Sequence, residues 1–288
     1  MLKSNYSGGY GIIGTSLKHT LSPMIYRYLA NKHNTEDIYS VIETSEDELG
    51  NTIELIKQRC LSGINVTFPF KQSIIDYLDG LDHDAQLIKS VNTVKIADNK
   101  MIGYNTDIFG IKATIENKLN FDSKDKVITI IGAGGAARAC IKYFADKNVG
   151  KICILNRTMS KAIEIINHFK IQYPRFDITC LDTDHINDNE IKIDLIINTT
   201  SADKLITMGL LKLLADNKLL SNTAYFDLNY GERALTNDLP LSITNRIDGL
   251  YMLAAQAVKS FEIWHGRATD PDEVYEYLTH EQKRYQYA

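Results

Sequence analysis

The sequence predicts an α/β protein of two domains, and three observations carry that prediction. The chain has 288 residues, about twice the length of a typical single domain. Short apolar runs alternate with helical patterns, and beyond residue 106 the alternation takes the form of right-handed βαβ units. A long helix rich in Ala and Leu, residues 249–265, follows these units. We expect it to pack back on the first domain, which would make that domain discontinuous.

Composition narrows the class of protein. Hydrophobic residues make up 44% and charged residues 24% of the chain, as in ordinary globular proteins. A net charge of −4 gives no sign of the basic face that a general nucleic-acid binder needs. No apolar run reaches the ~20 residues of a membrane helix, and the N-terminus lacks the apolar segment of a signal peptide. We therefore expect a cytoplasmic protein without nucleic-acid or membrane partners.

The cysteines agree with this location. Cys60, Cys140, Cys153 and Cys180 form no CxxC pair, so neither a zinc site nor a redox motif is expected. Few, scattered cysteines in a long chain are typical of a reducing cytosol and of a fold held by its own core. No metal is predicted.

The expected elements of the first domain follow from local signals. An apolar strand covers residues 10–13 and ends at Gly14. Ser22 and Pro23, as N-cap and first helical residue, open a helix that runs through residue 31. Ser45 and Glu48 form a capping box before a second helix. A β-branched strand covers residues 64–67, and strands over 91–97 and 101–104 form a hairpin.

The second domain begins with a different pattern. Residues 127–131 form a continuous apolar run, which suits a parallel sheet covered on both faces. Further strands are expected over residues 151–155, 193–197 and 223–228. A helix after the strand over residues 151–155 carries an apolar stripe of Met159, Ala162, Ile163, Ile166 and Phe169.

A glycine-rich loop directly follows the first strand of this domain and precedes a helix, the context that makes a GxGxxG/A match informative. Small residues allow a tight turn and a close backbone approach to a pyrophosphate, which the helix N-terminus then binds. This favours a Rossmann-like, doubly wound dinucleotide domain over a ligand-free turn. The predicted cofactor-binding residues of the loop are Gly132, Ala133, Gly134, Gly135 and Ala136.

The end of the second strand predicts which dinucleotide is bound. An NAD enzyme usually carries an acidic residue here to bind the ribose hydroxyls, but this chain has Asn156-Arg157-Thr158. Arg157 offers a planar cation to a 2′-phosphate, Asn156 and Thr158 add hydrogen-bonding groups, and Lys161 adds charge one turn later. The alternative is a solvated basic loop.

Polar residues of the first domain suggest a substrate site. Thr20 and Ser22 lie two residues apart before a helix, where two hydroxyls suit a carboxylate, although N-capping alone would also explain Ser22. Asn65 and Thr67 share one face of a strand. Lys71 falls near the start of the helix expected after Pro69, where a cation is unfavourable, and a lysine so placed suits a general base. An exposed surface lysine is the alternative.

Asp107 opens another helix where the two domains meet. It is either a carboxylate that stabilises the helix start or the partner of Lys71 across a cleft. Asn92, at the start of the hairpin, is expected to point the same way.

Seven motifs in this order resemble the shikimate dehydrogenase family over nearly the whole chain. The motifs are residues 14–23 (GTSLKHTLSP), 65–71 (NVTFPFK), 91–93 (VNT), 103–107 (GYNTD), 132–138 (GAGGAAR), 156–158 (NRT) and 248–257 (DGLYMLAAQA). Each motif alone is weak, but seven in order at compatible spacing are highly specific.

The resemblance implies the reversible, NADPH-dependent reduction of 3-dehydroshikimate to shikimate, on the chorismate route to aromatic amino acids. It implies that Lys71 and Asp107 are the catalytic pair and that Thr20 and Ser22 bind the substrate carboxylate. Asn65, Thr67, Asn92 and Gln256 match the family's residues that bind the ring hydroxyls. Tyr230 matches the tyrosine that reaches the substrate, and Gly249 matches a further cofactor-binding position.

The chain departs from the family pattern at several positions. The first carboxylate-binding residue is usually Ser but is Thr20 here, and the family's His after Ser-Pro is Tyr26. The Pro-x-Gly-Met segment that usually follows Asn198-Thr199-Thr200 is missing, as is a proline shortly after Tyr230. These changes leave the chemistry intact and keep two alternatives open: a dual-specificity quinate/shikimate dehydrogenase, which Thr20 suggests, and a non-catalytic dinucleotide-binding sensor.

The expected organisation is therefore a substrate-binding domain of residues 1–106 plus 245–288 and an NADP-binding domain of residues 107–244. The active site is expected in the cleft between them, at the carboxyl ends of the strands. We expect the protein to act as a monomer or homodimer on a small-molecule substrate.

Overall fold

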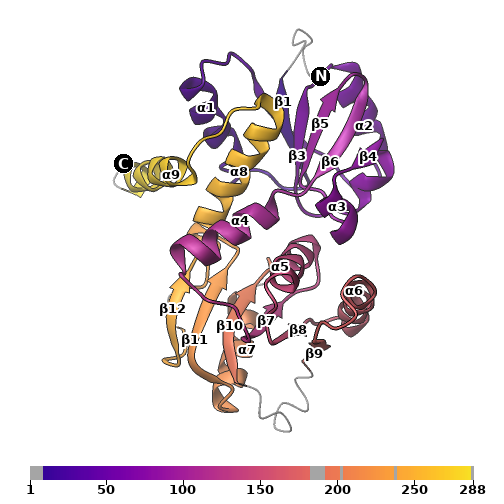
Figure 1. Cartoon of the computed structure of the whole chain (residues 1–288). Helices are drawn as coiled ribbons and strands as arrows, with labels where there is room; N and C mark the ends of the chain where they lie inside the picture. Colours follow the sequence, from indigo (N-terminus) through magenta and orange to yellow (C-terminus); the bar gives the residue numbers. More distant parts are fainter. Residues whose placement is uncertain (1–8, 182–191, 202–203, 237–238, 287–288) are drawn as a thin grey trace. The chain divides into compact units, whose positions relative to one another are not determined.

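The computed structural model describes residues 9–181, 192–201, 204–236 and 239–286 (Figure 1). The chain divides into two compact units: unit 1 comprises Met1–Phe109 and Ala254–Ala288, and unit 2 comprises Gly110–Leu253. Each unit has its own sheet with helices packed against it. The two-domain α/β class, with a discontinuous first part, is confirmed.

Unit 1 contains a mixed six-stranded sheet with the strand order β2-β1-β3-β5-β6-β4. Strand β1 pairs in parallel with β2 and β3, whereas β5 pairs antiparallel with β3 and β6. The β5–β6 pair is the predicted hairpin. The strands are β1 (Tyr10–Gly14), β2 (Tyr39–Glu43), β3 (Gly63–Val66), β4 (Gly80–Leu81), β5 (Thr93–Ala97) and β6 (Lys100–Tyr104).

Helices complete unit 1, and an apolar core fixes them to the sheet. The core brings Ile53 and Ile56 of α2 against Ile64 and Val66 of β3, the residues that helical and strand periodicity place on inward faces. Late in α8, the Trp264 Nε1–H donates to the Val94 carbonyl oxygen at 3.0 Å, which anchors this helix to β5. The helices wholly within unit 1 are α1 (Ser22–Lys32), α2 (Leu49–Gln58), η1 (Ser73–Tyr77), α3 (His83–Ile88) and α9 (Pro271–Gln286). Two more helices belong to both units along the chain: α4 (Asp107–Ala113), which begins in unit 1, and α8 (Leu250–His265), which continues into unit 1 from Ala254.

Unit 2 contains a six-stranded sheet with the order β12-β11-β10-β7-β8-β9, in which every strand pair is parallel. The order runs outward in both directions from neighbouring β7 and β10, which is the doubly wound Rossmann arrangement with its switch point between those two strands. The strands are β7 (Val127–Ile131), β8 (Lys151–Leu155), β9 (Ile178–Cys180), β10 (Ile193–Asn198), β11 (Leu220–Asp227) and β12 (Ile243–Ile247).

Helices connect these strands, and the central strands are buried as their apolar runs predict. Ile128, Ile130, Ile152, Ile154 and Ile196 have no exposed surface, because helices cover both faces of a parallel sheet. The helices of unit 2 are η2 (Thr114–Lys118), α5 (Gly135–Asp146), α6 (Met159–Gln172), α7 (Lys204–Asp216) and η4 (Gly231–Arg233).

Three local predictions are wrong. Ser22 lies inside α1: the N-cap residue is Leu21, and no side chain caps the helix. The capping box of Ser45 and Glu48 does not form, because the N-cap residue is Glu48 itself and it makes no side-chain capping hydrogen bond. The segment after Pro69 forms turns and the five-residue 3₁₀ helix η1, so no long helix dipole acts on Lys71.

The apolar stripe of α6 is also shifted from its predicted position. Met159 and Ile163 are 48% and 46% exposed, whereas Ile165 packs inward with the predicted Ala162, Ile166 and Phe169. The helix therefore turns a slightly different face to the sheet.

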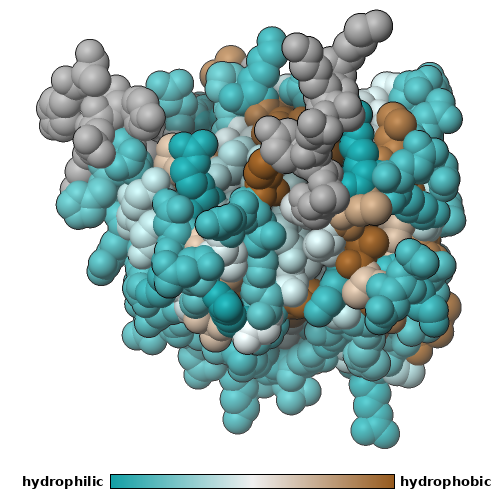
Figure 2. All heavy atoms as spheres, turned by 90° about the horizontal axis from the view of Figure 1, so that it is seen from above, coloured by the Kyte–Doolittle hydropathy of each residue, from teal (hydrophilic) through white to brown (hydrophobic). Residues whose placement is uncertain are grey.

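Figure 2 shows one face of the molecule, on which hydrophilic side chains predominate and hydrophobic ones form small patches. Among the described residues, no helix combines the length and the apolar character required to cross a membrane.

Candidate active site

Lys71 and Asp107 form an ion pair in unit 1. Lys71 lies in the turns between β3 and η1, and Asp107 is the first residue of α4. The Lys71 Nζ donates to Asp107 Oδ2 at 2.6 Å, and the two side chains are only 20% and 6% exposed. A short, charge-assisted bond of this kind fixes the ammonium group in one position. The structure thus brings the predicted catalytic pair together, and Lys71 is not a free surface lysine.

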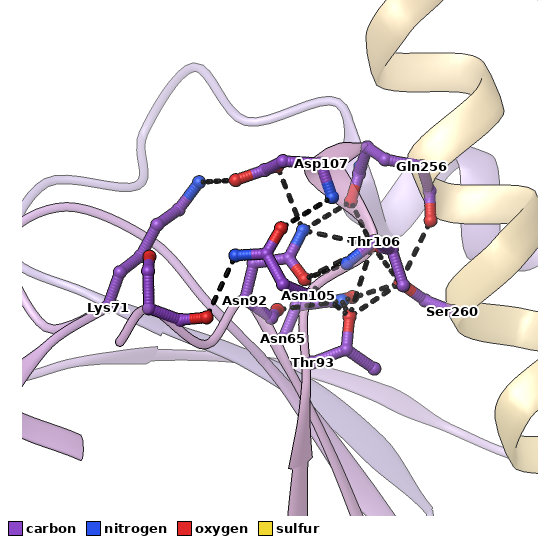
Figure 3. Close-up of polar contacts among 10 residues, drawn as sticks. Asn65, Lys71, Asn92, Thr93, Asn105, Thr106, Asp107, Gln256 and Ser260 are labelled. Carbon is purple, nitrogen blue, oxygen red and sulfur yellow. Dashed lines mark hydrogen bonds and ion pairs between the residues drawn. The ribbon is translucent and has the colours of Figure 1, made fainter. Parts of the chain in front are cut away.

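Asn92 holds the other side of Asp107 (Figure 3). Its Nδ2 donates to Asp107 Oδ1 at 2.9 Å, and its Oδ1 accepts from the backbone N–H of Thr106 at 2.7 Å. Asn92 is 4% exposed, so this amide is locked by buried partners. Both carboxylate oxygens of Asp107 are therefore engaged, one by a cation and one by a neutral donor.

Helix α8 contributes two further groups to this network. Gln256 Oε1 accepts from Asn92 Nδ2 at 3.4 Å and from Thr106 Oγ1 at 3.3 Å. Ser260 Oγ lies 2.8 Å from Thr93 Oγ1 and 3.2 Å from Thr106 Oγ1. Ser260 was not predicted, although its spacing of four residues from Gln256 places both on one helix face.

Asn65 and Tyr39 link this network to the region of Thr20 and Ser22. Tyr39 on β2 donates its hydroxyl to Asn65 Oδ1 at 2.7 Å, and Asn65 Nδ2 donates to Ser260 Oγ at 3.1 Å. Ser22 also hydrogen-bonds to Tyr39, and burial raises the pKa of the Tyr39 phenol well above its usual value. Tyr39 is therefore a neutral donor, and sequence reasoning missed it because β2 was not predicted.

Thr20 and Ser22 contact each other. The Thr20 hydroxyl donates to Ser22 Oγ at 3.1 Å, and the Ser22 backbone N–H donates to Thr20 Oγ1 at 3.3 Å. The pair of hydroxyls thus stands at the start of α1 without capping it. Thr67 follows β3, and its methyl group lies close to Gly14.

Tyr26, which stands where the family has His, packs face to face on Tyr39 with ring centroids 4.8 Å apart. Its hydroxyl lies 3.1 Å from His265 Nε2. The tyrosine at position 26 therefore stacks on the Tyr39 ring and contacts His265 of α8. The Tyr39 hydroxyl still donates to Asn65.

The glycine loop lies at the switch point of unit 2. Gly132 has φ +114, and a Cβ there would lie 2.4 Å from Thr199 Oγ1 in the segment after β10, so only glycine fits. Gly134 is the exposed N-cap residue of α5, and a Cβ built on it would meet open space. Ala133, Gly135 and Ala136 are half-buried around it. The first amides of α5 lack intrahelical partners, so this loop fits a pyrophosphate.

Two cationic side chains lie after β8, one in the loop and one in the first turn of α6. Arg157 and Lys161 are exposed and make no ion pair with any residue in the described ranges. The Asn156 side chain donates to the Thr158 carbonyl oxygen at 2.8 Å and so shapes the turn before α6. Two unpaired cations beside this turn fit the 2′-phosphate of NADP.

Asp227 organises the loop that carries Tyr230. This carboxylate has no exposed surface and accepts hydrogen bonds from the Tyr225 hydroxyl, the Asn198 side chain, the Leu235 backbone N–H and both nitrogens of Asn229. Tyr230 and Gly249 belong to unit 2, whereas the residues of the polar network belong to unit 1.

Gly249 lies beside this loop. Its backbone N–H donates to the Asn229 carbonyl oxygen at 2.8 Å, and a Cβ on Gly249 would lie 2.1 Å from the Leu228 carbonyl oxygen. A glycine is therefore required here for the close approach of two backbone segments.

Family models match most of the chain. A model of the shikimate dehydrogenase substrate-binding domain matches residues 12–94, one of shikimate/quinate 5-dehydrogenase matches residues 114–230, and one of the shikimate 5′-dehydrogenase C-terminal domain matches residues 249–276.

Individual relatives agree with these matches. A shikimate dehydrogenase (NADP⁺) of Clostridium perfringens is 32% identical over 277 residues, which are 93% of this chain and 97% of the relative. The Aquifex aeolicus shikimate dehydrogenase structure has a TM-score of 0.77 at 31% identity and covers 96% of this chain and 98% of its own. A shikimate dehydrogenase solved with NADP⁺ has a TM-score of 0.81 at 30% identity, with 96% of each chain covered.

Proposed function

The chain belongs to the shikimate dehydrogenase family, and we propose that it catalyses the reversible, NADPH-dependent reduction of 3-dehydroshikimate to shikimate in chorismate biosynthesis. The observation that carries this proposal is the ion pair of Lys71 and Asp107, 2.6 Å long and held on its far side by Asn92. A positioned lysine beside a buried carboxylate is suited to proton exchange with an alcohol or carbonyl oxygen.

In the reductive direction, the Lys71 ammonium donates a proton to the carbonyl oxygen and becomes a neutral amine, which regains a proton from solvent. In the oxidative direction, the neutral amine accepts the proton of the reacting hydroxyl of shikimate and becomes the ammonium. Asp107 orients Nζ and stabilises its charged form. Bound NADP supplies the hydride acceptor, and NADPH supplies the hydride. Because Asn92 fixes Asp107 from a buried position, the proton-transfer geometry is set before substrate binds.

Substrate recognition is assigned to polar groups around this pair. The hydroxyls of Thr20 and Ser22 bind the carboxylate. Asn65, Thr67, Asn92, Gln256 and, from unit 2, Tyr230 hold the ring hydroxyls. Hydrogen bonds link Thr20, Ser22, Asn65, Asn92 and Gln256 to one another or to Tyr39 and Ser260. These bonds support the assignment because they restrict the side chains to a single arrangement.

Cofactor binding is assigned to unit 2. The α5 N-terminus and the loop from Gly132 to Ala136 bind the pyrophosphate, Gly249 lies at a further cofactor contact, and Arg157 and Lys161 bind the 2′-phosphate with Asn156 and Thr158 beside them. The open space at Gly134 and the unpaired cations support this assignment.

Ser22→Ala should raise KM for shikimate more than it lowers kcat, because a carboxylate is bound alike in the ground and transition states. Since Ser22 does not cap α1, the roughly 1 kcal/mol loss of a cap is not expected. Steady-state kinetics and thermal unfolding of the variant test both points, and an unchanged KM would remove Ser22 from carboxylate binding.

Thr20→Ser provides the companion variant. If the Thr20 methyl restricts ring substituents, the ratio of kcat/KM for shikimate to that for quinate should change when the methyl is removed. The same ratio in both proteins would reject the idea that Thr20 governs this preference. Thr20 is the feature that keeps dual shikimate/quinate specificity as a second candidate function.

Arg157→Ala should weaken NADP and barely affect NAD, because NAD lacks the 2′-phosphate. The unmutated protein should prefer NADP by at least ~10-fold, which corresponds to about 1.4 kcal/mol. High salt should reduce the preference, since the contact is exposed and screened, and adding Lys161→Ala should reduce it further. Equal loss of NAD and NADP affinity would mean that Arg157 supports the loop without binding the phosphate.

Location and assembly are part of the proposal. None of the four cysteines, which all lie in the described ranges, forms a disulfide, and this supports a reducing, cytoplasmic location. We expect a monomer or homodimer without nucleic-acid partners, to be checked by light scattering of the purified protein.

The activity itself is tested by incubating the purified protein with shikimate and NADP and following nicotinamide absorbance, with mass spectrometry of the product. NADPH and 3-dehydroshikimate should form together. Binding of NADP without turnover of shikimate would refute the proposed enzyme activity.

A further inference from the structure

Arg138 is a buried cation with an incomplete set of partners. It lies in the first turns of α5, directly after the glycine loop, and its side chain is 4% exposed. The Nη2 group donates to Glu164 Oε1 at 2.8 Å, while Nε and Nη1 have no hydrogen-bond partner within the described part of the chain. A buried guanidinium with two N–H donors that lack acceptors lowers the free energy of unfolding. A contribution to stability therefore does not by itself explain this residue.

Its partner Glu164 lies on α6 three residues after Lys161. Residues three apart are neighbours on a helix surface, and a Lys–Glu pair at this spacing attracts. Glu164 is 69% exposed and Lys161 is exposed, yet the carboxylate pairs with Arg138 of the neighbouring helix. Lys161 makes no ion pair with another described residue.

We propose that Arg138 is a positioning residue for the 2′-phosphate of NADP: by binding Glu164, it keeps Lys161 unpaired and available to the phosphate. Arg138 also offsets the negative charge of Glu164, which would otherwise stand one turn from the phosphate site. This inference rests on the proposed function, because it takes NADP as the cofactor and the turn after β8 as the 2′-phosphate site.

The test measures dissociation constants for NADP and NAD by calorimetry, without turnover. Arg138→Met should raise Kd for NADP by about 3- to 5-fold, the effect of losing one partly screened charge contact, and should leave Kd for NAD within about twofold. Glu164→Gln alone should leave NADP binding equal or tighter. The double variant should regain most of the lost NADP affinity, because no carboxylate is left to capture Lys161.

A matched control keeps the change of charge but moves it to the opposite end of α5. Lys147 is the C-cap residue of that helix and pairs with Glu116 at 2.7 Å. Lys147→Met should leave the ratio of the two dissociation constants unchanged. Arg138→Gln, which retains a polar group at the buried position, replaces Arg138→Met if that variant does not fold, and the same NADP-specific loss is expected.

Any of the following results would overturn the inference. Equal weakening of NAD and NADP by Arg138→Met would place Arg138 in support of the glycine loop, which serves both cofactors. An NADP-specific loss that Glu164→Gln does not reverse would show that Glu164 is not the link to Lys161. If the unmutated protein fails to prefer NADP, the proposed cofactor is wrong. If it prefers NADP and the Arg138 variants retain that preference, only this inference fails.

Discussion

Lys71→Ala should lower kcat for shikimate oxidation by about 10²–10⁴-fold, the range for loss of a positioned acid or base. Lys71 Nζ is fixed at 2.6 Å from Asp107, so the substitution removes an acid/base group from a defined position. The Kd for shikimate should change far less, because the proposed carboxylate contacts at Thr20 and Ser22 remain. Stopped-flow kinetics and calorimetry on the same preparation separate the two quantities.

Lys71→Ala also leaves the buried Asp107 carboxylate without its cation, so the free energy of unfolding of this variant must be measured as well. Asp107→Asn retains the side-chain shape without the charge, and it should lower kcat while the protein stays folded. Lys57→Ala removes an exposed lysine that pairs with Glu54 and should leave both kcat and KM unchanged. A Lys71→Ala enzyme that is folded and has near-normal kcat would exclude Lys71 from proton transfer.

Asp227→Ala should lower the free energy of unfolding by about 3–5 kcal/mol, because it leaves buried donors without their acceptor. The Tyr225 hydroxyl, the Leu235 N–H and the Asn229 nitrogens all donate to this carboxylate. The loss should appear as a lower midpoint of urea unfolding.

The control is an exposed aspartate of the same unit. Asp177 is 53% exposed and lies 3.7 Å from Lys151 Nζ, so Asp177→Asn should cost less than about 1 kcal/mol. If Asp227→Ala unfolds at the same urea concentration as Asp177→Asn, then the hydrogen bonds around Asp227 contribute little to unit 2.

The central strands of unit 2 were predictable because their signal is local, whereas the edge strands β9 and β12 were not predicted. Strands β7 and β8 begin and end at the predicted residues, since a strand buried on both faces is a continuous apolar run. The glycine loop was predictable for the same reason: its sequence directly encodes the positive φ and close approach seen at Gly132.

Features that depend on distant neighbours were not predictable. Ser22 matches a capping signal, but its hydroxyl bonds to Thr20 and Tyr39, because side-chain hydroxyls bond to whichever partner the fold supplies. Tyr39 and Ser260 became recognisable only once β2 and α8 were placed beside Asn65. Lys71 was singled out because of an expected helix start, whereas its position depends on Asp107, 36 residues away.

The most direct test of the account compares kcat/KM for shikimate and for quinate, each with NADP and with NAD, on one preparation of the unmutated protein. The account predicts that shikimate with NADP is the best combination, at least ~10-fold better than shikimate with NAD, because Arg157 and Lys161 are free to bind the 2′-phosphate. A higher value for quinate with NAD would contradict both the cofactor assignment and the biosynthetic role.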